Sequence, residues 1–143
     1  MYRRFLTFSG RPGSDTAVIH TWLTKRNFGE LESVRLEMLE KMSKELGYDL
    51  ADSDVLFDVP KIGKTHDMLP ALYVRDPDGH YRILTDLSGV VASLCQEFEN
   101  LTKKSRIYVS PLVREKLNTD KKEADRIENA FRDFLSLRAK KES

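Results

Sequence analysis

The strongest constraint on the fold is a run of apolar side chains at three- and four-residue steps between residues 31 and 46. The run consists of Leu31, Val34, Met38, Met42 and Leu46. This spacing puts its members on one face of an α-helix, and the following Gly47 is a stop signal because glycine readily adopts the left-handed conformation that ends helices. We therefore expect a helix of about four turns with one face buried against other elements.

The same spacing predicts a second long helix over residues 85–101. Its apolar stripe consists of Leu87, Val90, Val91, Leu94, Phe98 and Leu101. A third helix is expected to begin near Asn118 or Thr119 and to bury Ile127, Phe131, Phe134 and Leu135. A shorter helix, capped by Ser14 or Asp15, should run through Trp22. All of these need a common core to cover their apolar faces.

Short β-rich segments alternate with these helices. They cover residues 55–59, 71–74, 81–84 and 106–109. The turn Asp76-Pro77-Asp78-Gly79 joins two of them into a hairpin, because proline fixes φ and glycine accepts a positive φ. The sequence thus predicts the α+β class, with a small antiparallel or mixed sheet and helices packed on one face.

Composition narrows the class of protein. The 143 residues suit a single domain, and 24 basic against 23 acidic side chains leave a formal net charge of +1. Without a basic excess, nucleic acid is an unlikely partner, and no run approaches the roughly 20 apolar residues that span a bilayer. The one cysteine, Cys95, cannot form an internal disulfide and is expected to be a small buried hydrophobe. We expect a cytoplasmic protein.

One residue pair invites a metal-site interpretation. His66-Asp67, with His20 upstream and Asp76 or Asp86 downstream, has the residue types that bind divalent metal. Metal chemistry needs such ligands on a rigid scaffold, whereas this pair lies in an aperiodic stretch between two expected strands. A solvated loop is the favoured interpretation. The sequence also lacks a P-loop, a glycine-rich dinucleotide fingerprint and a nucleophile elbow, so we predict no catalytic residue, metal ligand or cofactor in this chain.

Basic residues are the better candidates for binding. Arginine suits phosphate geometry, and the loop at residues 9–14 could add backbone N–H donors. The basic side chains concerned are Arg3, Arg4, Arg11, Lys61, Lys64, Lys103, Lys104 and Arg106. A solvated charged face remains the more ordinary explanation for them.

Three stretches together resemble the C-terminal part of HD-domain phosphohydrolases, the superfamily that includes the deoxynucleoside triphosphate triphosphohydrolases. They are Tyr2-Arg3-Arg4-Phe5-Leu6-Thr7-Phe8-Ser9-Gly10, then Asp54-Val55-Leu56-Phe57-Asp58-Val59-Pro60-Lys61 with Leu72-Tyr73-Val74, and Ser105-Arg106-Ile107-Tyr108-Val109-Ser110-Pro111-Leu112-Val113. The first looks like the last helix leaving the catalytic core of that family. The resemblance covers roughly residues 1–115.

The resemblance implies a non-catalytic accessory or regulatory domain. The catalytic domain, with its divalent metal, would lie N-terminal to Met1, and the intact protein would act on a nucleotide or another phosphate ester. Residues 1–14 would then be a linker from the missing core, residues 15–139 the accessory domain and residues 140–143 a frayed tail. The implied partners are the chain's own catalytic domain, further copies in a homo-oligomer, and a nucleotide effector whose phosphate Arg3 or Arg4 would help to bind.

An alternative stays open. A stand-alone α+β module could contact RNA or protein through Tyr73, Arg75, Tyr81 and Arg82, because aromatic and basic side chains on one sheet face can stack on bases.

Overall fold

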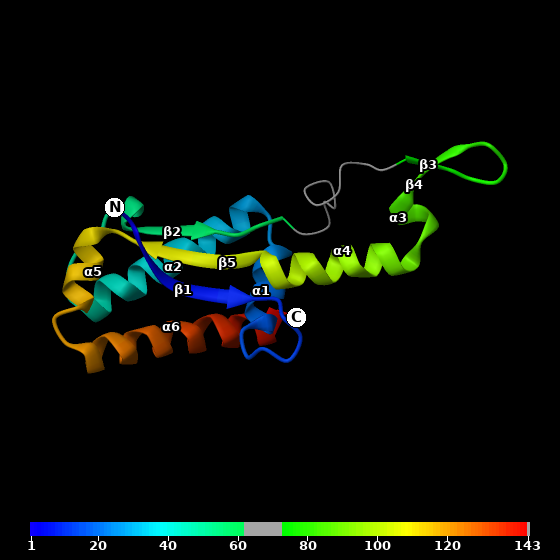
Figure 1. The fold of residues 1–143 in the computed structure, drawn as a ribbon. Helices are drawn as coiled ribbons and strands as arrows, with labels where there is room; N and C mark the ends of the chain where they lie inside the picture. Colours follow the sequence, from blue (N-terminus) through cyan, green and yellow to red (C-terminus); the bar gives the residue numbers. More distant parts are fainter. Residues whose placement is uncertain (62–72, 143) are drawn as a thin grey trace.

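The computed structural model describes residues 1–61 and 73–142, which form a body and a projecting arm (Figure 1). The elements of the body are β1 (Arg3–Ser9), α1 (Ala17–Thr24), α2 (Phe28–Leu46), the 3₁₀ turn η1 (Asp52–Asp54), β2 (Val55–Asp58), β5 (Lys104–Val109), α5 (Pro111–Leu117) and α6 (Lys121–Glu142). The elements of the arm, which we define as residues 73–102, are β3 (Tyr73–Arg75), β4 (Tyr81–Ile83), α3 (Leu84–Leu87) and α4 (Gly89–Thr102).

An antiparallel sheet in the order β1-β5-β2 organises the body. Along the central strand β5, Ser105, Ile107 and Val109 are buried, whereas Arg106 and Tyr108 are only half-buried. This alternation shows that one face of the sheet carries the core and the other is partly open, since successive side chains point to opposite faces. The predicted α+β class is confirmed.

The core lies between the sheet and the helices α1, α2, α5 and α6. Phe5 and Phe131 meet edge to face within it, with ring centroids 6.0 Å apart. Phe5 is buried next to Leu6 because the β1–β5 register shifts between Arg4 and Leu6. This irregularity turns two successive side chains of β1 toward the core, which strict alternation would not allow.

Helix α2 begins and ends at local signals. Asn27 accepts the backbone N–H of Glu30 at 2.9 Å, and the Glu30 carboxylate accepts the N–H of Asn27 at 2.9 Å. This reciprocal capping box satisfies two amide groups that have no partner inside the helix. At the other end Gly47 has φ 63°, as the sequence predicted.

The predicted strand over residues 106–109 is followed directly by a helix. The Ser110 side chain accepts the N–H of Val113, and Pro111 is the first residue of α5. Proline is favoured there because its missing N–H would have no helical partner. The sequence analysis predicted no helix between this strand and residue 118, so it missed α5.

Both ends of the chain are more ordered than the expected linker and tail. Residues 1–14 contain β1, which buries Phe5, Leu6 and Phe8 in the core and is a strand, not the end of a helix. At the C-terminus α6 continues through Glu142, whose carboxylate accepts the indole N–H of Trp22 at 3.1 Å. The expected fraying of residues 140–143 is therefore not seen in the part described, which ends at residue 142.

The helix predicted over residues 85–101 is divided. Ser88 adopts φ −128° and ψ 109°, which separates the short α3 from α4. Within the described part of the chain, no helix combines the length and the apolar character needed to cross a membrane.

Candidate functional site: a projecting arm and a groove on the body

The hairpin at the tip of the arm is held by its own turn. Asp76 accepts the N–H of His80 at 2.9 Å through its side chain and donates its backbone N–H to the His80 carbonyl at 2.8 Å. Gly79 has φ 88°, a conformation that is strained for other residues. The guanidinium of Arg82 pairs with the Asp76 carboxylate at 2.9 Å. The predicted turn is confirmed.

The hairpin register separates the four residues of the alternative binding surface. Tyr73 pairs with Ile83 and Arg75 with Tyr81, so Tyr73, Arg75 and Tyr81 share one face. Arg82 pairs with Val74 on the opposite face. Both tyrosines are exposed, Tyr73 by 63% and Tyr81 by 71%. Two aromatic side chains and one cation therefore lie on the same face of the hairpin. Arg82 lies on the opposite face, where it pairs with Asp76.

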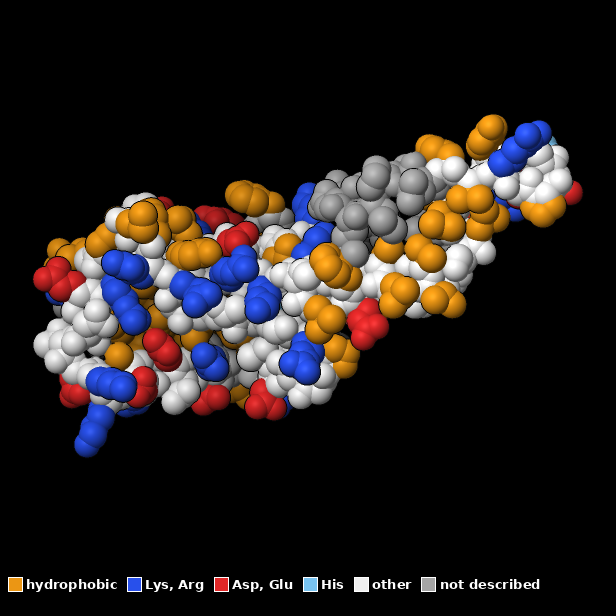
Figure 2. Space-filling model, in the orientation of Figure 1, with side chains coloured by type: hydrophobic (Ala, Val, Ile, Leu, Met, Phe, Trp, Pro, Cys, Tyr) orange, Lys and Arg blue, Asp and Glu red, His pale blue; other side chains and the backbone are white. Residues whose placement is uncertain are grey.

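Helix α4 exposes an apolar stripe to solvent. Val90 is 71% exposed, Leu94 60% and Phe98 50%, and Leu101 extends the same face. The steps of three and four residues align them along one side of the helix. Figure 2 shows apolar side chains gathered along the arm, whereas lysine and arginine side chains are spread over the body. No arm residue described belongs to the core cluster. We call this surface the α4 stripe.

Cys95 lies on the face of α4 next to the stripe. It is 3% exposed and has a free thiol, so its predicted burial is confirmed. Val91 and Ala92 are also half-buried. The covered face of α4 therefore carries small side chains, and the large ones next to them in the sequence face solvent.

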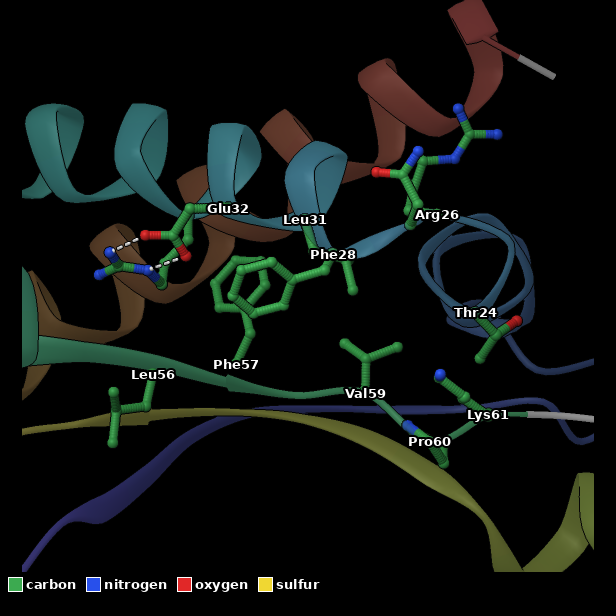
Figure 3. A pocket seen from close by; sticks show the side chains of 12 residues that line it. Thr24, Arg26, Phe28, Leu31, Glu32, Leu56, Phe57, Val59, Pro60 and Lys61 are labelled. Atoms are coloured by element: carbon green, nitrogen blue, oxygen red, sulfur yellow. Dashed lines mark hydrogen bonds and ion pairs between the residues drawn. The ribbon is translucent and has the colours of Figure 1, made fainter.

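A groove on the body lies between the start of α2 and strand β2 (Figure 3). Its volume is about 540 Å³, and its lining is mainly apolar. The apolar side chains in it are Phe28, Leu31, Leu56, Phe57, Val59 and Pro60. Phe57 extends from β2 toward α2, because it pairs with Ile107 on the core face of the sheet. Phe28, the first residue of α2, is 83% exposed. We call this hollow the α2–β2 groove.

Charged groups border the groove. The Arg35 guanidinium donates to the Glu32 carboxylate, and this pair lowers the pKa of Glu32. Arg26 turns away from the hollow and lies 3.7 Å from the Glu142 carboxylate. Lys61 borders the end of the groove opposite the Arg35–Glu32 pair, next to Pro60. Arg35 and Arg26 are thus each paired with a carboxylate, and Lys61 adds a positive charge at the edge of the groove.

The candidate metal ligands are not brought together in the described part of the chain. His66 and Asp67 lie outside the described residues. His20 is buried between α1 and β5, where its Nδ1 lies 2.9 Å from the Ser105 hydroxyl, while Asp76 pairs with Arg82 in the arm. Residues 1–61 and 73–142 contain no group of three or more His, Cys, Asp or Glu side chains that could hold a metal ion.

The two candidate effector-binding arginines lie on the edge strand β1. Arg3 is paired with Val109, which points to the core face, and Arg4 with Tyr108, which points to the open face. Paired residues of antiparallel strands share a face, so the two guanidinium groups leave the strand on opposite sides. Both residues are exposed. The structure does not bring them together on one phosphate.

Comparison with known proteins adds no relative. The chain matches no protein-family model, and neither a curated protein nor a solved structure matches it significantly.

The sequence reasoning missed the exposure of the α4 stripe. An apolar face of this kind ordinarily packs on the core of its own domain, and its spacing alone does not say which core covers it. The distribution of charged residues along the sequence nevertheless distinguishes the arm from the body. The arm carries two arginines against five carboxylates, a formal net charge of −3, whereas residues 1–61 and 103–143 carry 21 basic and 17 acidic residues, a net charge of +4.

Proposed function

We propose that this chain is a non-catalytic accessory domain of an HD-family metal-dependent phosphohydrolase, and that its arm docks on another protein surface. The observation that carries the docking role is the exposed α4 stripe. Fully burying a valine, leucine or phenylalanine side chain stabilises a structure by about 1.5–3 kcal/mol. Val90, Leu94 and Phe98 realise only part of this in the isolated chain. Large contiguous apolar patches are typical of interaction surfaces.

The three resembling stretches lie together in the structure. The stretches around Phe5, Leu56 and Ile107 lie far apart in the sequence, yet they supply β1, β2 and β5 of one sheet. The stretch around Phe5 departs from the resemblance, which implied a helix there. In the intact protein the catalytic groups, the divalent metal and the nucleotide or phosphate-ester substrate would then belong to a region before Met1.

The accessory role also accounts for the candidate effector site. Arg3 and Arg4 extend from opposite faces of an edge strand, so each is open to a different neighbour. We expect one of them to contact the phosphate of a nucleotide effector at an interface of the homo-oligomer. The other would then be a solvated side chain.

The first test is the coding sequence upstream of the Met1 codon. A continuous frame encoding a helical region with a histidine, a His-Asp pair and a distant aspartate supports the proposal. The intact protein should then hydrolyse nucleotides with a divalent metal. Replacing Leu94 and Phe98 by glutamine should impair its assembly or activation, and Arg3→Ala and Arg4→Ala should differ in their effect on nucleotide activation. An upstream region without such ligands, or an intact enzyme indifferent to the arm substitutions, contradicts the proposal.

One observation favours a second candidate, an RNA-contacting module. Tyr73, Arg75 and Tyr81 share an exposed face of the hairpin, and exposed aromatic rings next to arginine can stack on bases. The arm's net charge of −3 opposes this role. Titration with single-stranded RNA at two salt concentrations decides it: binding that weakens steeply with salt and is lost in Tyr81→Ala supports RNA recognition. Absence of binding at low salt rules it out.

A further inference from the structure

The arm and the α2–β2 groove are both apolar surfaces that no described residue of the same chain covers. The α4 stripe is convex and projects from the body, whereas the groove is a hollow of about 540 Å³ on the body (Figures 1 and 3). Leu94 and Phe98 of the stripe are 60% and 50% exposed, and Phe28 of the groove is 83% exposed. The chain therefore carries both a protruding and a receiving surface of the same chemical character.

The charges of the two surfaces are opposite. The arm has a formal net charge of −3 and the body +4. At the groove, Glu32 neutralises Arg35 and Glu142 neutralises Arg26, which leaves the charge of Lys61 at the edge of the hollow. Coulomb attraction therefore favours contact between the arm of one molecule and the body of another, and it disfavours contact between two arms.

The arm cannot reach the groove of its own chain. Helix α4 ends at Thr102 and β5 begins at Lys104, so a single residue joins the arm to the central strand of the sheet. This connection fixes α4 in a direction that leads away from the body (Figure 1). A second copy faces no such restriction.

We propose that the arm of one copy occupies the α2–β2 groove of a second copy. The side chains of Leu94 and Phe98 pack against those of Phe28 and Phe57, while the acidic arm as a whole faces a body of positive net charge. A two-fold arrangement makes this contact twice, once in each direction. The inference rests on the proposed docking role of the arm and adds the surface that receives it.

The test is the self-association of the full chain, measured by sedimentation velocity over micromolar concentrations. Leu94→Gln changes the arm and Phe28→Gln changes the groove, both without changing net charge. Leu137→Gln, at a position 68% exposed on α6, is the matched control. Each of the first two should raise the dimer dissociation constant by about tenfold or more, because each acts at both contacts. The control should leave it unchanged.

Mixing the two variants separates this arrangement from other dimers. A heterodimer of Leu94→Gln and Phe28→Gln chains retains one intact contact, made by the unaltered arm in the unaltered groove. In the other contact the two altered side chains meet, and because Leu94 and Phe28 touch in this arrangement, their substitutions cost less together than separately. The mixture should therefore associate more strongly than either variant alone. Thermal unfolding of each variant checks that the fold is retained.

The sign of the salt dependence is a second, independent readout. Attraction between the acidic arm and the basic body weakens as salt is added, whereas arm-to-arm packing would strengthen because the like charges are screened. A monomeric wild-type chain, a dimer unaffected by Phe28→Gln, or a dimer strengthened by salt would overturn this inference. A dimer weakened by Leu94→Gln alone leaves the docking role of the arm intact and refutes only the groove. The proposed function itself fails separately, through an intact enzyme indifferent to the arm.

Discussion

The imidazole of His20 accepts the backbone N–H of Ser105 through Nδ1, at 3.2 Å, across 85 residues of sequence. The same nitrogen lies 2.9 Å from the Ser105 hydroxyl. Because Nδ1 is the acceptor, the ring hydrogen belongs on Nε2. His20 is 1% exposed, and burial lowers the pKa of its imidazole. The contact thus links α1 to the central strand in the neutral form of the ring.

The stability of the domain should consequently fall in mild acid. The unfolded chain binds a proton at His20 below a pKa of about 6.5, whereas the folded chain resists it. The free energy of unfolding should therefore be at its full value above pH 7 and decrease as the pH falls toward the lower folded-state pKa. This group supplies at most about 1.4 kcal/mol per pH unit. Urea unfolding at pH 7.5 and 5.5 measures the change. His20→Asn should remove most of it, and an unchanged slope would refute this role.

The edge-to-face pair of Phe5 and Phe131 should dominate the stability of the β1–α6 contact. Phe131→Ala removes a ring that is 3% exposed, and we expect a loss of about 3–5 kcal/mol. Leu137→Ala, at a solvent-exposed position of the same helix, should change stability by less than about 0.5 kcal/mol. Chemical denaturation of both proteins gives the comparison. Similar effects of the two substitutions would contradict the assigned position of the core.

Substitution of Asn27, the first residue of the capping box, should reveal how much the capping box of α2 contributes to stability. Asn27→Ala removes the acceptor for the Glu30 N–H and should reduce the free energy of unfolding by about 1 kcal/mol. Asn27→Asp keeps an acceptor at the same place and should be nearly neutral. Equal destabilisation by both substitutions would indicate that the loss arises elsewhere.

The carboxylate of Glu142 should stabilise the C-terminal end of α6. It accepts the Trp22 indole N–H at 3.1 Å and lies 2.9 Å from the Arg138 guanidinium. Glu142→Ala should lower the free energy of unfolding. The fluorescence of Trp22, the single tryptophan, should report the change. Glu40→Ala removes an exposed ion pair with Lys44 and should have a smaller effect. A frayed end, as the sequence suggested, would make Glu142→Ala silent.

Local chemistry explains why much of the secondary structure was predictable. Gly47 ends α2 and the Asp76–Gly79 turn forms the hairpin, because both depend on the conformations of one or two residues. The apolar spacing of residues 31–46 likewise required a helix with one buried face. These features are properties of short segments and do not depend on distant residues.

The sequence by itself determined the α+β class and most of the elements, but only the tertiary structure decided which apolar faces are buried. The stripes of α2 and α4 have the same helical spacing, yet Met38 is fully buried whereas Leu94 is 60% exposed. Spacing records only that side chains share a face. The burial of that face depends on its neighbours: α2 lies against β2, whereas the single residue that joins α4 to β5 leaves α4 pointing away from the body. Likewise, β1 brings Arg3 and Arg4 to opposite faces through its register with β5, and strand register is fixed by pairing between residues about 100 positions apart.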